Sequence, residues 1–114
     1  CTIDAFKLEE MQKNGEIKGC LVGGPFALDN AVSEEAAKHK GMTHPIGGKA
    51  DILLVPNIES GNILYKSLVF FAKGENAGLI VGAKAPIVLT SRADSDITKL
   101  NSIALAVLAA SKQN

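Results

Sequence analysis

Two stretches of the chain place apolar residues at the three- and four-residue spacing of a helix that buries one face. The first covers residues 3–11 and stops near Asn14-Gly15, where a glycine permits a left-handed C-cap. The second begins at Ser95 or Asp96. Its apolar stripe, which we expect to be buried, consists of Ile97, Leu100, Ile103, Ala104, Val107 and Leu108.

Short apolar runs and two further helical segments lie between these ends. The runs lack polar alternation, which is typical of strands buried on both faces, and they cover residues 17–22, 51–56, 78–82 and 87–90. An alanine-rich helix is predicted at 27–40, and another at 63–73 after a turn at 57–62. The order α-β-α-β-α-β-β-α predicts a three-layer α/β/α architecture with a mostly parallel sheet. The adjacent strand pair means that part of the sheet is antiparallel or that the last run leaves it.

Composition limits the possible partners. A chain of 114 residues, 46% of them hydrophobic, is long and apolar enough for one small domain with a core. Twelve basic and twelve acidic residues give a formal net charge of +0, and no basic stripe indicates a nucleic-acid or membrane-surface partner. The apolar runs are too short to span a bilayer. Because the chain starts at Cys1 and opens directly on a helix, we expect a piece of a longer polypeptide.

The cysteines and histidines do not indicate a metal site. Cys1 and Cys20 have no CxxC spacing and are typical of free thiols in a cytoplasmic protein, although the sequence leaves a disulfide between them open. His39 and His44 are not spaced as metal ligands, and we interpret both as surface or turn residues.

The only arginine, Arg92, lies where a predicted strand runs into the last predicted helix. Such a junction in an α/β protein presents backbone N–H groups to anions, and arginine adds a planar fork suited to phosphate or carboxylate. Ser91 precedes it, and Asp94 and Asp96 follow as candidate bases. Two plainer interpretations stay open: Arg92 pairs with one of these aspartates, or Asp94 or Ser95 caps the helix.

Nine strings of residues, distributed over nearly the whole chain, carry a resemblance to a known family. They are residues 17–20 (IKGC), 24–29 (GPFALD), 33–37 (SEEAA), 39–41 (HKG), 50–54 (ADILL), 56–62 (PNIESGN), 65–66 (YK), 85–95 (APIVLTSRADS) and 101–106 (NSIALA). In this order they resemble the phosphate acetyl/butyryltransferase family, and its butyryl members more closely than its acetyl members. The chain resembles the C-terminal portion of such an enzyme.

The resemblance implies a reaction and a fold. Acyl-CoA and inorganic phosphate would be converted reversibly into acyl phosphate and CoA, with butyryl as the expected acyl group. Coenzyme A is then a substrate, and neither a cofactor nor a metal is required. The family's active site is a cleft between two α/β domains of the isocitrate/isopropylmalate-dehydrogenase-like type. Within such a fold, residues 1–85 would form part of the second subdomain and residues 86–114 would return to the first.

The resemblance also assigns roles to residues. Arg92 would hold the phosphoryl group, and Ser91 would hydrogen-bond the thiol or phosphate. The base is left open between Asp94 and Asp96, because the acetyl enzymes' catalytic aspartate corresponds to Thr98. Residues with an expected substrate-binding role are Asn57, Glu59, Gly61, Asn62, Tyr65 and Lys66. A family aspartate is replaced by Gly23, with a consequence that the sequence leaves open.

The resemblance leaves three hypotheses for the whole protein. The first is a phosphate acyltransferase, a homo-oligomer whose isolated 114-residue portion is inactive because part of the cleft lies outside it. The second is a non-catalytic, acyl-CoA-binding regulatory module. The third is an α/β domain whose apolar faces serve dimerisation. The first hypothesis predicts that catalysis is lost without Arg92, whereas the third predicts that replacing Arg92 has almost no effect.

Overall fold

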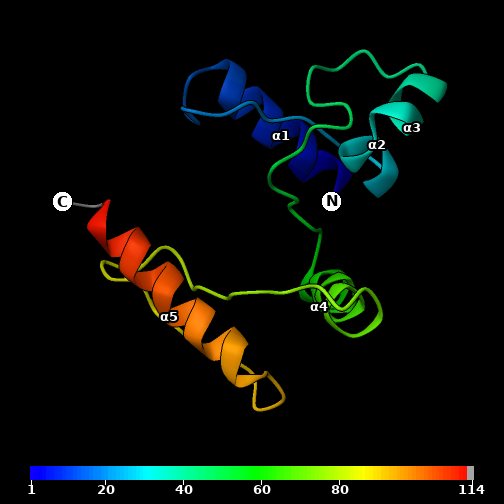
Figure 1. Cartoon of the computed structure of the whole chain (residues 1–114). Helices are drawn as coiled ribbons and strands as arrows, with labels where there is room; N and C mark the ends of the chain where they lie inside the picture. The colour runs from blue at the N-terminus through cyan, green and yellow to red at the C-terminus, as the bar shows by residue number, and fades with distance from the viewer. Residues whose placement is uncertain (113–114) are drawn as a thin grey trace. The chain divides into compact units, whose positions relative to one another are not determined.

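The computed structural model describes residues 1–112 and contains two compact units, divided between Ile58 and Glu59. We call them the N-terminal unit (Cys1–Ile58) and the C-terminal unit (from Glu59 onwards). Their regular structure is helical (Figure 1). The helices are α1 (Thr2–Lys13), α2 (Leu28–Val32), α3 (Glu34–His39), α4 (Ile58–Lys66), a π-helical turn (Ser67–Phe71) and α5 (Asp96–Ser111).

The first predicted helix is confirmed as α1. It ends at Asn14, whose backbone N–H donates to the carbonyl oxygen of Glu10, and Gly15 follows with a φ of 79°. A residue with a side chain would be strained at that φ, so the glycine at this position permits the turn away from the helix. Lys13 pairs with Glu9 one helical turn earlier, at 2.6 Å.

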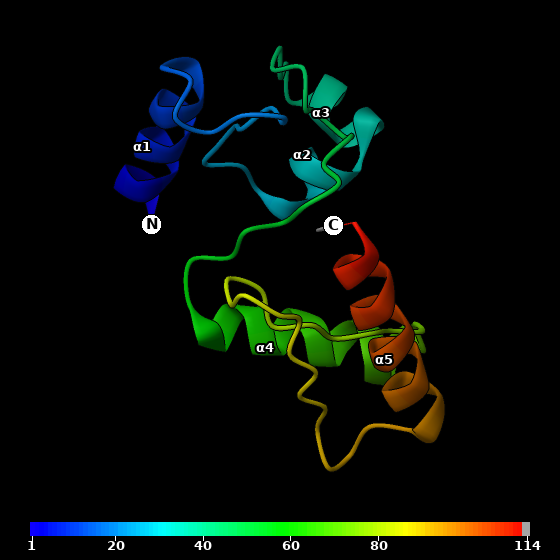
Figure 2. The same cartoon turned by 90° about the vertical axis from the view of Figure 1, so that its left-hand side faces the viewer.

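The prediction of one helix over residues 27–40 is wrong, because Ser33 divides this segment into α2 and α3. Ser33 has an extended backbone (φ −128°, ψ 114°), and its Oγ accepts from the N–H of Ala36 at 3.2 Å as the N-cap of α3. A serine side chain that bonds the backbone in this way competes with continuation of a helix. The two short helices pack side by side, and Ala31 and Ala37 are their buried residues (Figures 1 and 2).

The predicted strands are not formed within residues 1–112. The apolar runs are irregular, and the ladder contact among them in this range is one antiparallel bridge, in which the N–H of Ile80 donates to the carbonyl oxygen of Ile87 at 2.9 Å. A strand needs a neighbour to pair its backbone groups and cover its side chains. Here Ile52 and Leu54 are 85% and 79% exposed. The expected three-layer α/β/α architecture is therefore absent from the described residues.

The third predicted helix is displaced in the structure. Residues 57–62 were expected to form a turn before a helix at 63–73, whereas α4 already begins at Ile58 and regular α-helix ends at Lys66. The chain then widens into the π-helical turn, whose C-cap is Ala72. Gly61, in the middle of α4, was the misleading signal, because a single glycine weakens a helix without ending it.

The last predicted helix is confirmed in its start but not in its buried face. Helix α5 starts after Ser95, whose Oγ accepts from the N–H of Thr98 at 3.2 Å. The predicted apolar stripe is uncovered, with Ile97 and Val107 55% and 63% exposed. The buried residues of α5 are instead Thr98 and Ser102, which lie one turn apart on another side of the helix.

Ser102 joins α5 to the extended segment that precedes the apolar bridge. Its side chain is 0% exposed, its Oγ accepts from the N–H of Gly78 at 2.9 Å, and it donates to the carbonyl oxygen of Thr98 at 2.7 Å. The extended segment runs past α5 at this point (Figure 2). The buried hydroxyl has both a donor and an acceptor partner, so it ties this segment to α5.

We predict that Ser102→Ala lowers the free energy of unfolding by about 0.5–1.5 kcal/mol, because the Gly78 N–H loses its acceptor on α5. Denaturant unfolding followed by circular dichroism measures the loss. The matched control is Ser111→Ala: Ser111 also donates to a backbone carbonyl of α5, but it is exposed. Its change should stay within about 0.5 kcal/mol. Equal losses in the two variants would contradict the assigned role of Ser102.

Candidate functional site

The segment between the apolar bridge and α5 is closed by Ser91 and Asp94 into a tight turn. The N–H of Ser91 donates to Oδ2 of Asp94 at 2.7 Å, and the N–H of Asp94 donates to the carbonyl oxygen of Ser91 at 3.1 Å. The Ser91 Oγ accepts from the N–H of Ala93 at 3.3 Å. Side chains that accept local backbone N–H groups are a standard way of building such turns. Ser91 and Arg92 are consequently presented together on an exposed turn.

Arg92 makes no ion pair within residues 1–112, so the interpretation in which it pairs with a neighbouring aspartate is not borne out there. Asp94 accepts from the Ser91 backbone, and Asp96 pairs with Lys99 at 3.2 Å. The helix cap is made by Ser95. Arg92 is exposed, so its guanidinium is available for an anion.

Tyr65, at the end of α4, contacts this turn through its hydroxyl group. The phenol donates to Oδ1 of Asp94 across a long 3.4 Å and accepts from Nδ2 of Asn76 at 2.6 Å. Burial raises the pKa of Tyr65 above its ordinary value of 10.0, and the Asp94 carboxylate raises that pKa further. The phenol therefore stays protonated at neutral pH, where it acts as a hydrogen-bond donor and not as a base.

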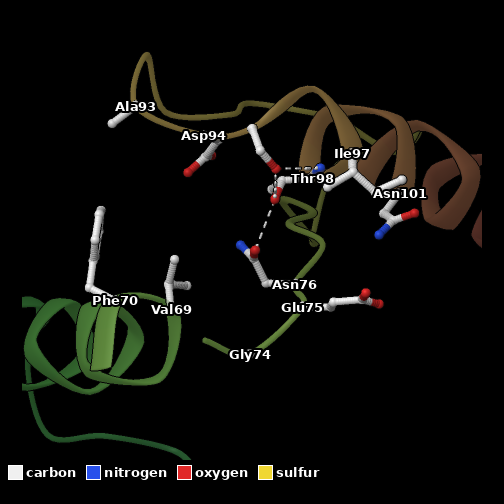
Figure 3. Close-up of a pocket in the computed structure, with 11 residues that line it drawn as sticks. Val69, Phe70, Gly74, Glu75, Asn76, Ala93, Asp94, Ile97, Thr98 and Asn101 are labelled. Atoms are coloured by element: carbon white, nitrogen blue, oxygen red, sulfur yellow. Dashed lines mark hydrogen bonds between the residues drawn. The ribbon is translucent and has the colours of Figure 1, made fainter. Parts of the chain in front are cut away.

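Asn76 connects the phenol to the start of α5. Its Oδ1 accepts from the hydroxyl of Thr98 at 3.0 Å, and Thr98 Oγ1 also lies 3.0 Å from the capping Oγ of Ser95. Figure 3 shows Asn76 reaching from the extended segment toward Thr98 on α5. Five side chains from three separate parts of the chain thus form one hydrogen-bonded series. In order, they are Asp94, Tyr65, Asn76, Thr98 and Ser95.

A cavity of about 200 Å³ lies beside this series (Figure 3). Apolar side chains from the π-helical turn and from α5 face it, and the polar groups nearby include those of the series itself. The lining residues are Val69, Phe70, Gly74, Glu75, Asn76, Ala93, Asp94, Ser95, Ile97, Thr98 and Asn101. Of the four residues expected to be catalytic, only Asp94 lines it; Ser91, Arg92 and Asp96 do not.

The expected substrate-binding residues are placed along α4. Glu59, Gly61 and Asn62 belong to its first turns, directly after Asn57. Tyr65 reaches the Ser91–Asp94 turn, as described above. The amino group of Lys66 lies 5.1 Å from the ring centre of Tyr65 and 5.6 Å from that of Phe70. The structure thus connects Tyr65 with the turn, and substrate binding by all six residues stays a prediction.

Sequence reasoning missed Asn76 and Ser102, and it noted Thr98 only as the counterpart of another residue. Thr98 and Ser102 lie four positions apart in α5, and this spacing could have indicated a polar contact on one side of the helix. Asn76 offered no such signal. It lies in an irregular segment, and only the tertiary structure places it between two hydroxyl groups.

Gly23 of the N-terminal unit lies against an aromatic pair. A Cβ atom on this glycine would lie 2.5 Å from Cε1 of His44 and 2.9 Å from the ring of Phe26, and the two rings meet edge to face with centroids 5.3 Å apart. His44 lies in a turn, as predicted, and His39 is the exposed last residue of α3. An aspartate at position 23 would require this packed pair to move.

The part of the chain that the structure describes offers neither a metal cluster nor a membrane-spanning helix. No group of three or more His, Cys, Asp or Glu side chains there is arranged to hold a metal ion. Cys1 and Cys20 are both free and exposed, so the disulfide alternative is not formed. None of the described helices has the length and hydropathy that crossing a bilayer requires.

Comparison with known proteins places the chain in a family. Residues 1–107 match the family model described as phosphate acetyl/butaryl transferase. The chain belongs to this phosphate acetyl/butyryltransferase family. It is 61% identical over 111 residues to the phosphate butyryltransferase of Clostridium beijerinckii, a match that covers 97% of this chain and 37% of that relative.

Two further relatives are similar to the chain. Identity to the phosphate acetyltransferase of Thermotoga maritima is 61% over 107 residues, covering 94% of this chain and 36% of the relative. The crystal structure of a branched-chain phosphotransacylase from Enterococcus faecalis V583 matches with a TM-score of 0.77 and 44% identity, over 93% of this chain and 38% of that one. The chain thus shares the family's fold and spans little more than a third of the length of these relatives.

We predict that the phenol of Tyr65 titrates above pH 10.0, and that Asp94→Asn moves its midpoint back toward that value by removing the carboxylate. Tyr65 is the only tyrosine and the chain has no tryptophan, so ultraviolet absorbance of the phenolate reports on this one group. Because the folded-state pKa is raised, the stabilisation linked to it is complete below the unfolded-state pKa and is lost as pH rises through the folded-state pKa.

The matched control for this titration is Asp96→Asn. Asp96 is exposed and pairs with Lys99, so its loss should leave the midpoint unchanged. A midpoint at or below 10.0 in the unmodified chain, or one that Asp94→Asn does not shift, would contradict the phenol–carboxylate contact.

Proposed function

We propose that the polypeptide carrying this chain is a phosphate acyltransferase that moves a short acyl group, butyryl by preference, between CoA and inorganic phosphate. Similarity to both butyryl- and acetyltransferases supports the general reaction. The preference for butyryl rests on the strings that resemble the butyryl members, above all residues 85–95. The observation that carries the proposal is the exposed Arg92 guanidinium, which has no carboxylate partner among the described residues although two aspartates lie within four positions.

Arg92 would act on the phosphoryl group. In the direction of acyl-CoA synthesis, the CoA sulfur attacks the carbonyl carbon of the acyl phosphate, a C–S bond forms, and the C–O bond to phosphate breaks. Negative charge then accumulates on the departing phosphate. A guanidinium offers two parallel N–H donors to phosphate oxygens, so it stabilises this charge without the need to reorient.

Ser91, Asp94 and Asp96 would have separate roles beside Arg92. Because the Ser91 oxygen accepts from Ala93, its own proton is free to be donated to the thiolate or to a phosphate oxygen. Asp94 accepts from both the Ser91 N–H and the Tyr65 hydroxyl, and we assign it to holding the turn. Asp96 is exposed, and Lys99 is its partner among residues 1–112, so its carboxylate would be available as the acceptor of the thiol proton.

The polypeptide outside these 114 residues would also supply neighbouring strands for the apolar segments. We propose that residues 51–56, 78–82 and 87–90 become strands of a three-layer α/β/α fold by pairing with chain outside these 114 residues. The exposure of Ile52, Leu54 and Leu89 supports this, since such side chains are normally covered in a sheet. In that fold, residues 1–85 and 86–114 would belong to different subdomains, and the enzyme would be a homo-oligomer. The 114-residue chain alone would then be inactive.

We predict that Arg92→Ala lowers kcat of the native polypeptide by about 100- to 1000-fold in a coupled assay for CoA and butyryl phosphate, because the phosphate loses its fixed donors. Arg92→Lys should recover only part of the rate, since lysine retains the charge but not the fork. Lys112→Ala, which removes an exposed cation from the other end of α5, should leave kcat unchanged. Full activity of Arg92→Ala would refute the proposed role, and CoA binding without turnover in the unmodified polypeptide would favour the regulatory-module hypothesis.

A further inference from the structure

Asn76 occupies a position that none of the expected roles accounts for. It lies in the irregular segment between the π-helical turn and the apolar bridge, yet its amide is engaged on both sides. Nδ2 donates to the Tyr65 hydroxyl at 2.6 Å, the shortest hydrogen bond of the series, and Oδ1 accepts from Thr98 at 3.0 Å. The side chain is half-buried, so water competes for these partners less than it would at the surface.

The orientation of the amide determines where the phenol proton points. Thr98 is fixed at the start of α5 by Ser95, and its hydroxyl donates to the amide oxygen. The amide nitrogen must then face Tyr65, where it donates to the phenol oxygen. With that oxygen occupied as an acceptor, the phenol directs its own proton to Asp94.

We propose that Asn76 is a positioning residue of the acyltransferase site: its amide holds the Tyr65 hydroxyl as a donor to Asp94, the carboxylate that closes the turn carrying Ser91 and Arg92. This role rests on the proposed function. Asn76 contacts neither Ser91 nor Arg92 in the structure; it acts on them through two intermediate side chains.

Contacts with α4 and α5 would fix the exposed turn that carries Ser91 and Arg92 in one position. The Ser91–Asp94 hydrogen bond spans only three residues and is exposed, so by itself it stabilises the turn weakly. The second oxygen of Asp94 ties the turn to Tyr65 on α4, and Asn76 ties Tyr65 to α5. A turn anchored to two helices loses less entropy when it binds a phosphate, and small displacements of reacting groups are costly in rate.

The first test is spectroscopic and uses the 114-residue chain. A donor to the phenol oxygen stabilises the phenolate, so Asn76→Ala should raise the Tyr65 titration midpoint further, opposite in direction to Asp94→Asn. Asn101→Ala is the matched control, because Asn101 lines the same cavity without joining the hydrogen-bonded series, and it should not shift the midpoint. Circular dichroism at each pH verifies that the chain stays folded.

A midpoint that falls in Asn76→Ala would mean that the amide accepts from the phenol, and this would overturn the proposal. An unchanged midpoint would do the same, since it would show that Asn76 does not act on the phenol.

The second test measures kinetics of the native polypeptide. Asn76→Ala should lower kcat by about 10- to 100-fold, with KM for CoA changed far less, because the loosened turn affects the reacting groups more than CoA binding. Tyr65→Phe, which retains the ring, should cause a similar loss. The double variant should be no slower than the worse single variant, because both act through one hydroxyl. Additive losses, or an unaltered kcat in Asn76→Ala, would overturn the proposal.

The two tests distinguish this proposal from the function on which it rests. A native polypeptide without acyltransfer would refute the proposed function, whereas a raised Tyr65 midpoint in Asn76→Ala would still support the contact that Asn76 makes. Normal turnover that is indifferent to Asn76 would leave the function standing and refute the positioning role.

Discussion

Two buried hydroxyl groups on α5 hold together the parts of the chain from which the candidate site is made. Ser102 fixes the backbone at Gly78, and Thr98 fixes the side chain of Asn76. Replacing either group by an apolar residue would remove the hydrogen-bond partner of the segment that contains Asn76 and Gly78. Buried hydrogen bonds of this kind stabilise modestly but specify position strongly, because only one arrangement satisfies every donor and acceptor. The turn at Ser91 is reached from Asn76 through one further side chain, Tyr65.

Many apolar side chains stay exposed, because the contacts within the chain are made largely by polar groups. Helix α5 uses a polar side for its contacts, and its apolar stripe stays uncovered within the described residues. The apolar runs are likewise joined, within those residues, by one backbone bridge between Ile80 and Ile87. A chain that spans little more than a third of its relatives contains the residues of their fold but only some of the surfaces against which those residues pack. Apolar exposure on this scale is typical of surfaces that other polypeptide covers.

Local signals predicted the helices well where a single residue decides the boundary. Gly15 ended α1 and Ser95 began α5, because a left-handed glycine and a capping serine act through their own backbone neighbours. Local signals failed at Ser33, which lies inside the predicted helix at 27–40 but is a cap, and at Gly61, which lies in the predicted turn at 57–62 but belongs to α4. In both cases the residue is compatible with either structure, and its environment made the choice.

The sequence by itself determined the family, the end of α1, the start of α5 and the candidate pair Ser91 and Arg92, since these depend on the identity and order of neighbouring residues. It also located the apolar runs, but not their pairing, because a strand exists only beside another strand. Tertiary structure alone decided that Arg92 has no aspartate partner among the described residues, that Asp94 closes the turn, and that Asn76 lies between Tyr65 and Thr98. The contacts of Tyr65 with Asn76 and Asp94, and of Asn76 with Thr98, join residues 11 to 29 positions apart, and no local preference of the chain encodes such a distance.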